Sequence, residues 1–165
     1  MGLDMWLSIN KGATKRGERG VPEFDRDIRE FASLDDWMNA CEKYREKVHL
    51  AVWRKASGIL NWFDHNLESV KNQEQLKEPV REGVQNYVVY PVTKAEYDKL
   101  LEDCIKVWNS KDVPEDMMPV SGFFFGPRLA DEGYWEDVKY TIEALTKKKD
   151  TIDWNNDKVY FHISY

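Results

Sequence analysis

Both ends of the chain carry the alternation of a β-strand, and this feature restricts the fold more than any other. In residues 3–9 every odd position is apolar, and residues 158–165 repeat the pattern from Val159 onward. A period of two places the apolar side chains on one face of a sheet. We therefore expect a strand at each terminus of a half-buried sheet.

Helical periodicity dominates the chain between these two strands. The strongest pattern follows Thr93, which forms a capping box with Glu96 and precedes an apolar stripe that reaches Trp108. Ser33 is expected to cap a helix that ends near Lys47, residues 56–67 carry a second stripe, and Asp131 or Glu132 begins a helix whose inner face reaches residue 145. These segments predict four helices.

The remaining segments have less regular sequence patterns. Residues 87–92 and 120–125 are β-branched or aromatic and are expected to form strands. Residues 48–52 fit either a short strand or the end of a helix. Residues 10–32 contain glycines, a proline and mixed charges, which predicts a long, mobile surface loop.

The length and composition fit one folded unit. A chain of 165 residues with 42% hydrophobic residues can bury one core, so residues 1–165 are expected to form a single globular domain. Intermixed strands and helices favour an α+β fold, with a mixed β-sheet and about three to four helices packed mainly on one face.

Charge and motif content exclude several classes of function. A net charge of −6 opposes binding to duplex nucleic acid, and no apolar stretch is long enough for a membrane span. Cys41 and Cys104 form no CxxC pair, and the N-terminus lacks a signal-peptide pattern, so a reducing cytoplasm is expected. Nucleotide-binding loops, the hydrolase elbow and the zinc-protease motif are absent, so we expect no cofactor and no metal.

A ligand-binding face is one interpretation of the segment after residue 53. Arg54, Gly58, Trp62 and His65 are spaced by four, four and three residues, which aligns them on a helix surface. Arg54 and Lys55 would hold an anionic group, Trp62 would stack on a planar ring, and Gly58 would admit the ligand to the backbone. The competing interpretation is a helix face covered by the loop 10–32.

Residues 121–126 read Ser-Gly-Phe-Phe-Phe-Gly and also allow two interpretations. The segment is either a central strand buried on both faces or a loop that forms the wall of a binding site. In the second case Ser121 offers a hydroxyl and Phe123 an aromatic ring to the ligand.

Acid–base catalysis is a third interpretation of the same region. His65 with a carboxylate such as Asp4 or Asp64 could serve a hydrolase. The two cysteines lie on predicted apolar stripes, where a thiol usually behaves as a small hydrophobic group.

Several segments together resemble a family of small proteins from bacteriophages and bacterial genomes. The matching segments are Gly2-Leu3-Asp4-Met5, Trp53-Arg54-Lys55-Ala56 through Trp62-Phe63, Tyr90-Pro91-Val92, residues 121–126, and Tyr134 with Asp137 and Thr141. The resemblance implies a location in the bacterial cytoplasm. It implies a binding role more than a reaction, such as blocking a host protein or sequestering a nucleotide signal used in antiviral defence.

These observations lead to one main functional hypothesis and one main alternative. The chain is expected to capture a small anionic, ring-containing ligand such as a nucleotide, with Asp4, Ser121, Phe123 and Tyr134 joining the helix residues around one cavity. The alternative is a protein–protein inhibitor whose acidic surface and exposed tryptophans dock on a basic host protein. A homo-oligomer is compatible with either.

Overall fold

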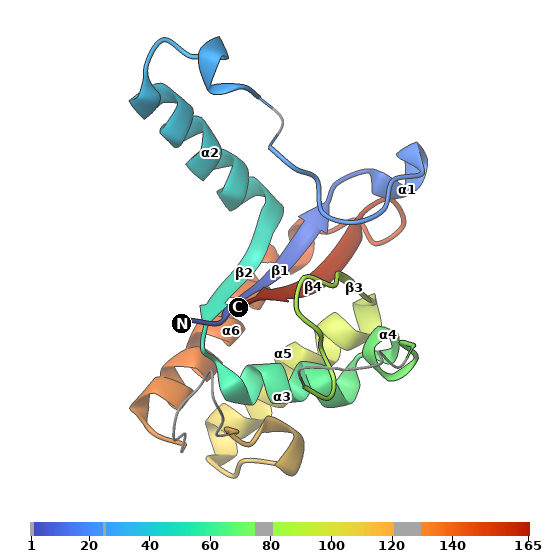
Figure 1. Cartoon of the computed structure of the whole chain (residues 1–165). Coiled ribbons are helices and arrows are strands. Elements are labelled where there is room, and N and C mark those ends of the chain that lie inside the picture. Colours follow the sequence, from blue (N-terminus) through green and yellow to red (C-terminus); the bar gives the residue numbers. More distant parts are fainter. Residues whose placement is uncertain (1, 25, 75–80, 121–129) are drawn as a thin grey trace.

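The four strands in the described part of the chain form one antiparallel sheet in the order β2-β1-β4-β3 (Figure 1). The computed structural model describes residues 2–24, 26–74, 81–120 and 130–165. The strands are β1 (Asp4–Asn10), β2 (His49–Arg54), β3 (Tyr90–Val92) and β4 (Lys158–Ser164). The two terminal strands predicted from the alternation are thus confirmed, and they pair with each other at the centre of the sheet.

Most of the helical mass lies in four elements, two of which begin at predicted caps. These are α2 (Leu34–Val48), α3 (Ser57–Asn66), α5 (Lys94–Ser110) and α6 (Glu132–Lys148). Ser33 caps α2, and Thr93 forms the complete capping box with Glu96 at α5. The ambiguous residues 48–52 divide between the two options, since Val48 ends α2 and residues 49–54 form β2.

Shorter elements fill the connections. The described chain also contains α1 (Ala13–Arg16), α4 (Glu68–Lys71) and 3-10 turns at Ile28–Glu30, Glu115–Met117 and Lys149–Thr151. The segment 10–32, predicted as a loop, therefore holds one short helix and one 3-10 turn. The predicted strand 120–125 lies almost wholly outside the described residues.

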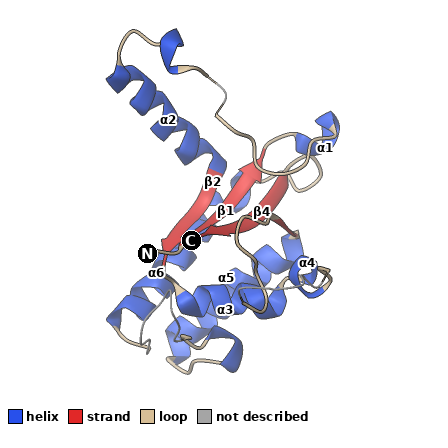
Figure 2. Ribbon diagram, in the orientation of Figure 1, coloured by secondary structure: helices blue, strands red, loops and turns tan. Residues whose placement is uncertain are grey.

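One face of the sheet carries the core. Helices α3, α5 and α6 lie below and behind the strands (Figure 2). The odd residues of β1 and β4 face these helices, and the Phe63 ring stacks on Phe161 with centroids 3.7 Å apart. The indole of Trp53 donates a 2.8 Å hydrogen bond to Thr141 of α6. The α+β class expected from the sequence is confirmed.

The other face of the sheet and helix α2 are far less covered. No described helix crosses the near face of β1, β2 and β4, and α2 extends away from the body as an arm (Figure 1). Val48 is the one buried residue of α2, at its junction with the sheet. None of the described helices is both long and apolar enough to cross a membrane.

Candidate functional site

The predicted ligand face of α3 points into the protein. Residues 57–63 of this helix are all buried, and Trp62 has no exposed surface. Its indole donates a 2.8 Å hydrogen bond to Asp103 of α5, so it cannot stack on a ligand in this structure. The sequence interpretation assumed one solvent-facing side, whereas a helix enclosed by a sheet and two helices is buried all round.

Arg54 also lies elsewhere than predicted, because it ends strand β2 and precedes α3. Its Cα is paired with that of Asp4 in β1, so these two predicted residues are neighbours in the sheet. The guanidinium lies over Gly2, where an added Cβ would be 2.8 Å from Nη2. Arg54 is exposed and does not share a surface with Trp62.

Three predicted residues do meet at the junction between β2 and α3. Lys55, Gly58 and Tyr134 line one small pocket with a volume of about 10 Å³, room for about one water. Lys55 adopts a left-handed backbone with φ of 54°, and the Tyr134 ring lies against Gly58. The Tyr134 hydroxyl is buried without a hydrogen-bond partner in the described structure, and burial raises its pKa.

Of the two carboxylates named for the hydrolase interpretation, Asp64 is engaged within the fold. Asp64 is held by a bidentate ion pair with Arg81 and by the amide of Val84, which donates to Oδ1 at 2.8 Å. His65 is exposed, and its Nδ1 lies 2.8 Å from the carbonyl oxygen of Asn61. These contacts engage both oxygens of Asp64 and one ring nitrogen of His65. Ser121 and Phe123 lie outside the described residues.

The cavity best suited to a small ligand lies at the other end of the sheet, and the sequence interpretation missed it. It has a volume of about 700 Å³, within the range of about 300–1,000 Å³ typical of ligand pockets. Its walls come from α1 and the following loop, from β3 with the start of α5, and from β4 with the preceding turn. The lining residues are Thr14, Arg19, Gly20, Val89, Pro91, Val92, Thr93, Lys94, Trp154, Asp157, Lys158, Val159 and Tyr160.

Positive charge predominates at this cavity. The Arg19 side chain is exposed and has no hydrogen bond or ion pair with any described residue. Lys158 donates to the carbonyl oxygen of Glu18 at 3.0 Å, and Lys94 forms a 2.6 Å ion pair with Asp98. Among the described lining residues only Asp157 is acidic, and its charge is already paired with Lys11.

Asp157 serves the local structure instead of a ligand. Its Oδ1 accepts the amide of Gly12 at 2.8 Å, and its Oδ2 accepts Lys11 at 3.1 Å and the amide of Asp153 at 2.9 Å. These donors hold the pKa of the carboxyl below its usual value against the opposing effect of burial. The contacts fix the turn that positions Lys158.

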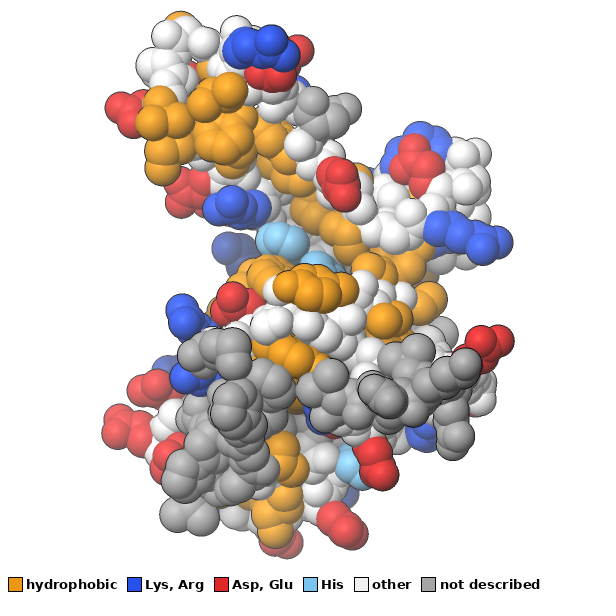
Figure 3. Space-filling view, in the orientation of Figure 1, with side chains coloured by type: hydrophobic (Ala, Val, Ile, Leu, Met, Phe, Trp, Pro, Cys, Tyr) orange, Lys and Arg blue, Asp and Glu red, His pale blue; other side chains and the backbone are white. Residues whose placement is uncertain are grey.

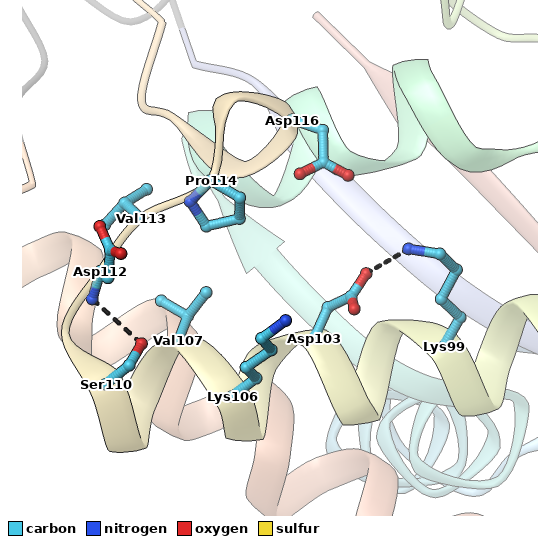
Figure 4. A pocket seen from close by; sticks show the side chains of 9 residues that line it. All are labelled: Lys99, Asp103, Lys106, Val107, Ser110, Asp112, Val113, Pro114 and Asp116. Atoms are coloured by element: carbon cyan, nitrogen blue, oxygen red, sulfur yellow. Dashed lines mark hydrogen bonds and ion pairs between the residues drawn. The ribbon is translucent and has the colours of Figure 1, made fainter.

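A second cavity, of about 340 Å³, lies between α5 and the turn at residues 115–117 (Figure 4). Two of its acidic groups are engaged in contacts within the fold. Asp103 accepts both Lys99 at 2.5 Å and the Trp62 indole, and Asp116 accepts Asn66 at 2.9 Å. The residues around this cavity are therefore better explained as polar contacts that hold α3, α5 and this turn together.

A serine between two histidines lies on the open face of the sheet. Ser8 Oγ is 2.8 Å from Nδ1 of His49 and 3.2 Å from Nε2 of His162, and the Trp6 ring stacks on His162 at 5.1 Å. Histidine side chains are visible at the waist of the molecule in Figure 3. Ser8 and Trp6 lie on the same face of the sheet because they are two residues apart in β1. The two histidines lie beside them because β2 and β4 pair with β1 in a register that sets His49 against Ser8 and His162 against Trp6.

This cluster is not arranged as a nucleophilic centre. Ser8 has no exposed surface, so a substrate cannot reach its hydroxyl. Burial lowers the pKa of His49 and lowers that of His162 to about 4, so both rings are neutral at pH 7. Because Ser8 has a single hydroxyl proton, at most one ring can accept it, and a ring that does not must donate an N–H to Oγ.

Metal ligands and relatives give no further assignment. Within the described ranges, no group of three or more His, Cys, Asp or Glu side chains is placed to hold a metal ion. Comparison of the chain with family models finds no match, and comparisons with curated proteins and with solved structures find none either.

Proposed function

We propose that the protein binds a small anionic molecule with a ring or other apolar body in the cavity between α1, β3 and β4. The observation that carries this proposal is the combination of about 700 Å³ of space with unneutralised basic side chains on a chain whose net charge is −6. A local positive site on an acidic protein favours a small anion while the overall field repels large polyanions.

Arg19 is the residue with the clearest role in this proposal. Its guanidinium has no internal partner among the described residues, whereas Lys94 is shared with Asp98. A planar guanidinium can bind a phosphate or carboxylate through two parallel hydrogen bonds. Lys158 would add a second positive charge, anchored by its hydrogen bond to the carbonyl oxygen of Glu18.

The remaining walls suit the apolar part of such a ligand. Val89, Pro91 and the half-buried Trp154 are among the uncharged residues that line the cavity. Hydrophobic side chains also reach the surface around the waist in Figure 3. A preformed apolar wall beside a few cationic groups is the usual composition of a site for a nucleotide-like or aromatic anion.

Isothermal titration calorimetry against mono-, di- and cyclic nucleotides and simple aromatic carboxylates tests the proposal. We expect one class to bind, and Arg19→Ala to weaken it by about 10- to 100-fold, the worth of one charge-assisted contact. Lys158→Ala should weaken it in the same direction. The proposal is wrong if the wild-type protein binds none of these compounds.

Two control variants locate the site. Arg54→Ala removes the cation of the original helix hypothesis, and Arg29→Ala removes an exposed arginine that is paired with Asp27 far from the cavity. Both should bind as the wild type does. Loss of binding in Arg54→Ala with normal binding in Arg19→Ala would instead place the ligand at the β2–α3 junction.

Docking on a basic host protein receives less support from the structure. All seven tryptophans lie in the described residues, and each is buried or half-buried. The exposed tryptophans on which that alternative depended are therefore not present, although the acidic charge remains.

A further inference from the structure

The loop that carries Arg19 follows α1 and lies beside the ends of β1 and β4 (Figure 1). Gly17 and Gly20 flank Arg19 in the left-handed conformation, with φ of 68° and 79°. Glycine restricts its own backbone less than any other residue does, so the loop sequence does not by itself fix the loop conformation. Contacts from outside the loop must therefore hold Arg19 at the cavity.

Asn10, the last residue of β1, makes two of these contacts. Its side-chain amide donates a 3.0 Å hydrogen bond to the carbonyl oxygen of Gly20 and a 3.3 Å hydrogen bond to the Glu18 carboxylate. Glu18 and Gly20 are the two neighbours of Arg19 in the chain. One side chain of a central strand thus holds the loop on both sides of the arginine.

The orientation of the Asn10 amide is itself fixed. Asn10 is 2% exposed, and its Oδ1 accepts a 2.8 Å hydrogen bond from Nη2 of Arg16. The oxygen and the amide nitrogen therefore both have partners, and a buried amide bonded in this way cannot rotate without losing several bonds. Asn10 is a rigid point to which the loop is attached.

The same network keeps a neighbouring carboxylate away from Arg19. Glu18 is the acidic residue nearest to Arg19 in the sequence, but Arg16 donates to its Oε1 at 2.9 Å and to its Oε2 at 3.1 Å. Hydrogen bonds from Arg16 and Asn10 lower the pKa of this carboxyl, so it stays ionised at neutral pH. Both carboxylate oxygens are engaged, and the guanidinium of Arg19 has no partner among the described residues.

We propose that Asn10 is a positioning residue of the cavity: through Glu18 and Gly20 it fixes the chain around Arg19, so that the guanidinium is presented to an anionic ligand. Asn10 is not among the residues that line the cavity, so it acts through the loop. The inference rests on the proposed function and deepens it, because it states what makes this arginine the one that binds the anion.

Backbone order, measured by NMR relaxation of the amides without any ligand, tests the first half of the proposal. Residues 18–20 of the wild type should have order parameters of about 0.85, the value of rigid backbone. Asn10→Ala removes both bonds to the loop and should lower these values below about 0.6. Asn10→Asp keeps the side-chain size and the acceptor for Arg16 but loses the donors, so it should act alike and serves if the alanine variant does not fold.

Asn61→Ala is the matched control for the loss of a buried asparagine. Asn61 is 7% exposed and donates to the carbonyl oxygens of Glu115 and Met118, which do not line the cavity. This variant should be destabilised as Asn10→Ala is. It should nevertheless leave both the order of residues 18–20 and the ligand affinity unchanged.

Calorimetry tests the second half, with those nucleotides and aromatic carboxylates that the wild type binds. Asn10→Ala should weaken binding by about tenfold, because the ligand then has to order the loop. In the Arg19→Ala background the same substitution should change the affinity by less than about twofold, since no guanidinium is left to position. Circular dichroism verifies that each variant is folded.

Four results would overturn the proposal, and they separate it from the proposed function. Unchanged order of residues 18–20 in the folded Asn10 variants would refute the positioning role whether or not a ligand binds. Unchanged affinity in Asn10→Ala would show that binding does not need a fixed loop, and losses that add in full with Arg19→Ala would show that Asn10 acts by another route. If the wild type binds none of the compounds while the Asn10 variants lose order, the proposed function is wrong and Asn10 only stabilises the loop.

Discussion

The indole Nε1 of Trp62 donates a 2.8 Å hydrogen bond to Oδ2 of Asp103, and this contact joins α3 to α5. The tryptophan has no exposed surface, and Lys99 both bonds the same carboxylate and lies 5.7 Å from the ring centroid. The residue whose chemistry best suited ligand stacking is thus a structural link between two helices.

Trp62→Phe should lower the free energy of unfolding by about 1–3 kcal/mol, through the lost hydrogen bond and the smaller ring. Urea denaturation measures this change. Asp103→Asn is the matched variant, because it keeps an acceptor for the indole and loses only a partly exposed ion pair, so it should cost no more than about 1 kcal/mol. Equal losses in the two variants would mean that the indole contributes little.

Gly58→Ala should destabilise the protein by about 2 kcal/mol or more. Its Cβ would lie 2.5 Å from Cε2 of Tyr134 and 2.8 Å from the carbonyl oxygen of Met117, and neither the buried ring nor the backbone can withdraw freely. Thermal unfolding measures the loss.

Gly133→Ala is the matched control for this helix glycine. The nearest atom to its added Cβ is Oδ1 of Asp131 at 3.3 Å, at an exposed position in the first turn of α6. Alanine is favoured over glycine in helices by roughly 0.5–1 kcal/mol, so this variant should be neutral or slightly stabilised. Similar losses in both would argue against the steric account.

Acidification should weaken the fold through the histidines around Ser8. Burial lowers the pKa of His162 to about 4 in the folded state, with His49 as the second cause, and the unfolded value is about 6.5. The folded state therefore favours the neutral ring, so this stability is complete above pH 6.5 and is lost as the pH falls toward 4. The expected loss is on the order of 2–3 kcal/mol.

His162→Phe removes this titration and can keep the stacking on Trp6. Its unfolding free energy should depend less on pH between 6.5 and 4 than that of the wild type, as measured by urea denaturation at each pH. His65→Gln, at an exposed ring, should retain the wild-type dependence. An unchanged slope in His162→Phe would show that the acid sensitivity arises elsewhere.

The ion pair between Asp64 and Arg81 should contribute more to the free energy of unfolding than the ion pairs on the surface do. Their side chains are 11% and 20% exposed, and Asp64 also accepts the Val84 amide. Asp64→Ala should cost about 2–4 kcal/mol, because a half-buried guanidinium and a backbone donor lose their partner together. Hydrogen exchange should show the loss first at the Val84 amide.

Asp98→Ala provides the comparison for this pair. It removes the partner of Lys94, which is 60% exposed, and should cost less than about 1 kcal/mol. A similar cost for both variants would show that the Asp64 pair is as well screened by solvent as the surface pair.

Local patterns were sufficient for most of the secondary structure. Thr93 with Glu96 and Ser33 each marked a helix start that the structure confirms, because capping bonds form between residues only three apart. The alternation in residues 3–9 likewise identified β1. The strand order β2-β1-β4-β3 could not be predicted from such patterns, because contacts between distant segments decide which strands pair.

The candidate site was predicted less well for the same reason. Spacing alone aligned Arg54 with Trp62, but Arg54 belongs to a strand and the whole circumference of α3 at Trp62 is enclosed. The cavity beside Arg19 draws its walls from three segments separated by more than 50 residues, and no linear motif marks such a site.

By itself, the sequence determined where strands and helices form and which class of fold they build, because hydrogen bonds and side-chain periodicity act over a few residues. Only the tertiary structure decided which polar and aromatic groups remain free for a ligand. The Trp62 indole is hydrogen-bonded to Asp103, whereas Arg19 has no partner among the described residues. That difference depends on which surfaces the packed helices cover.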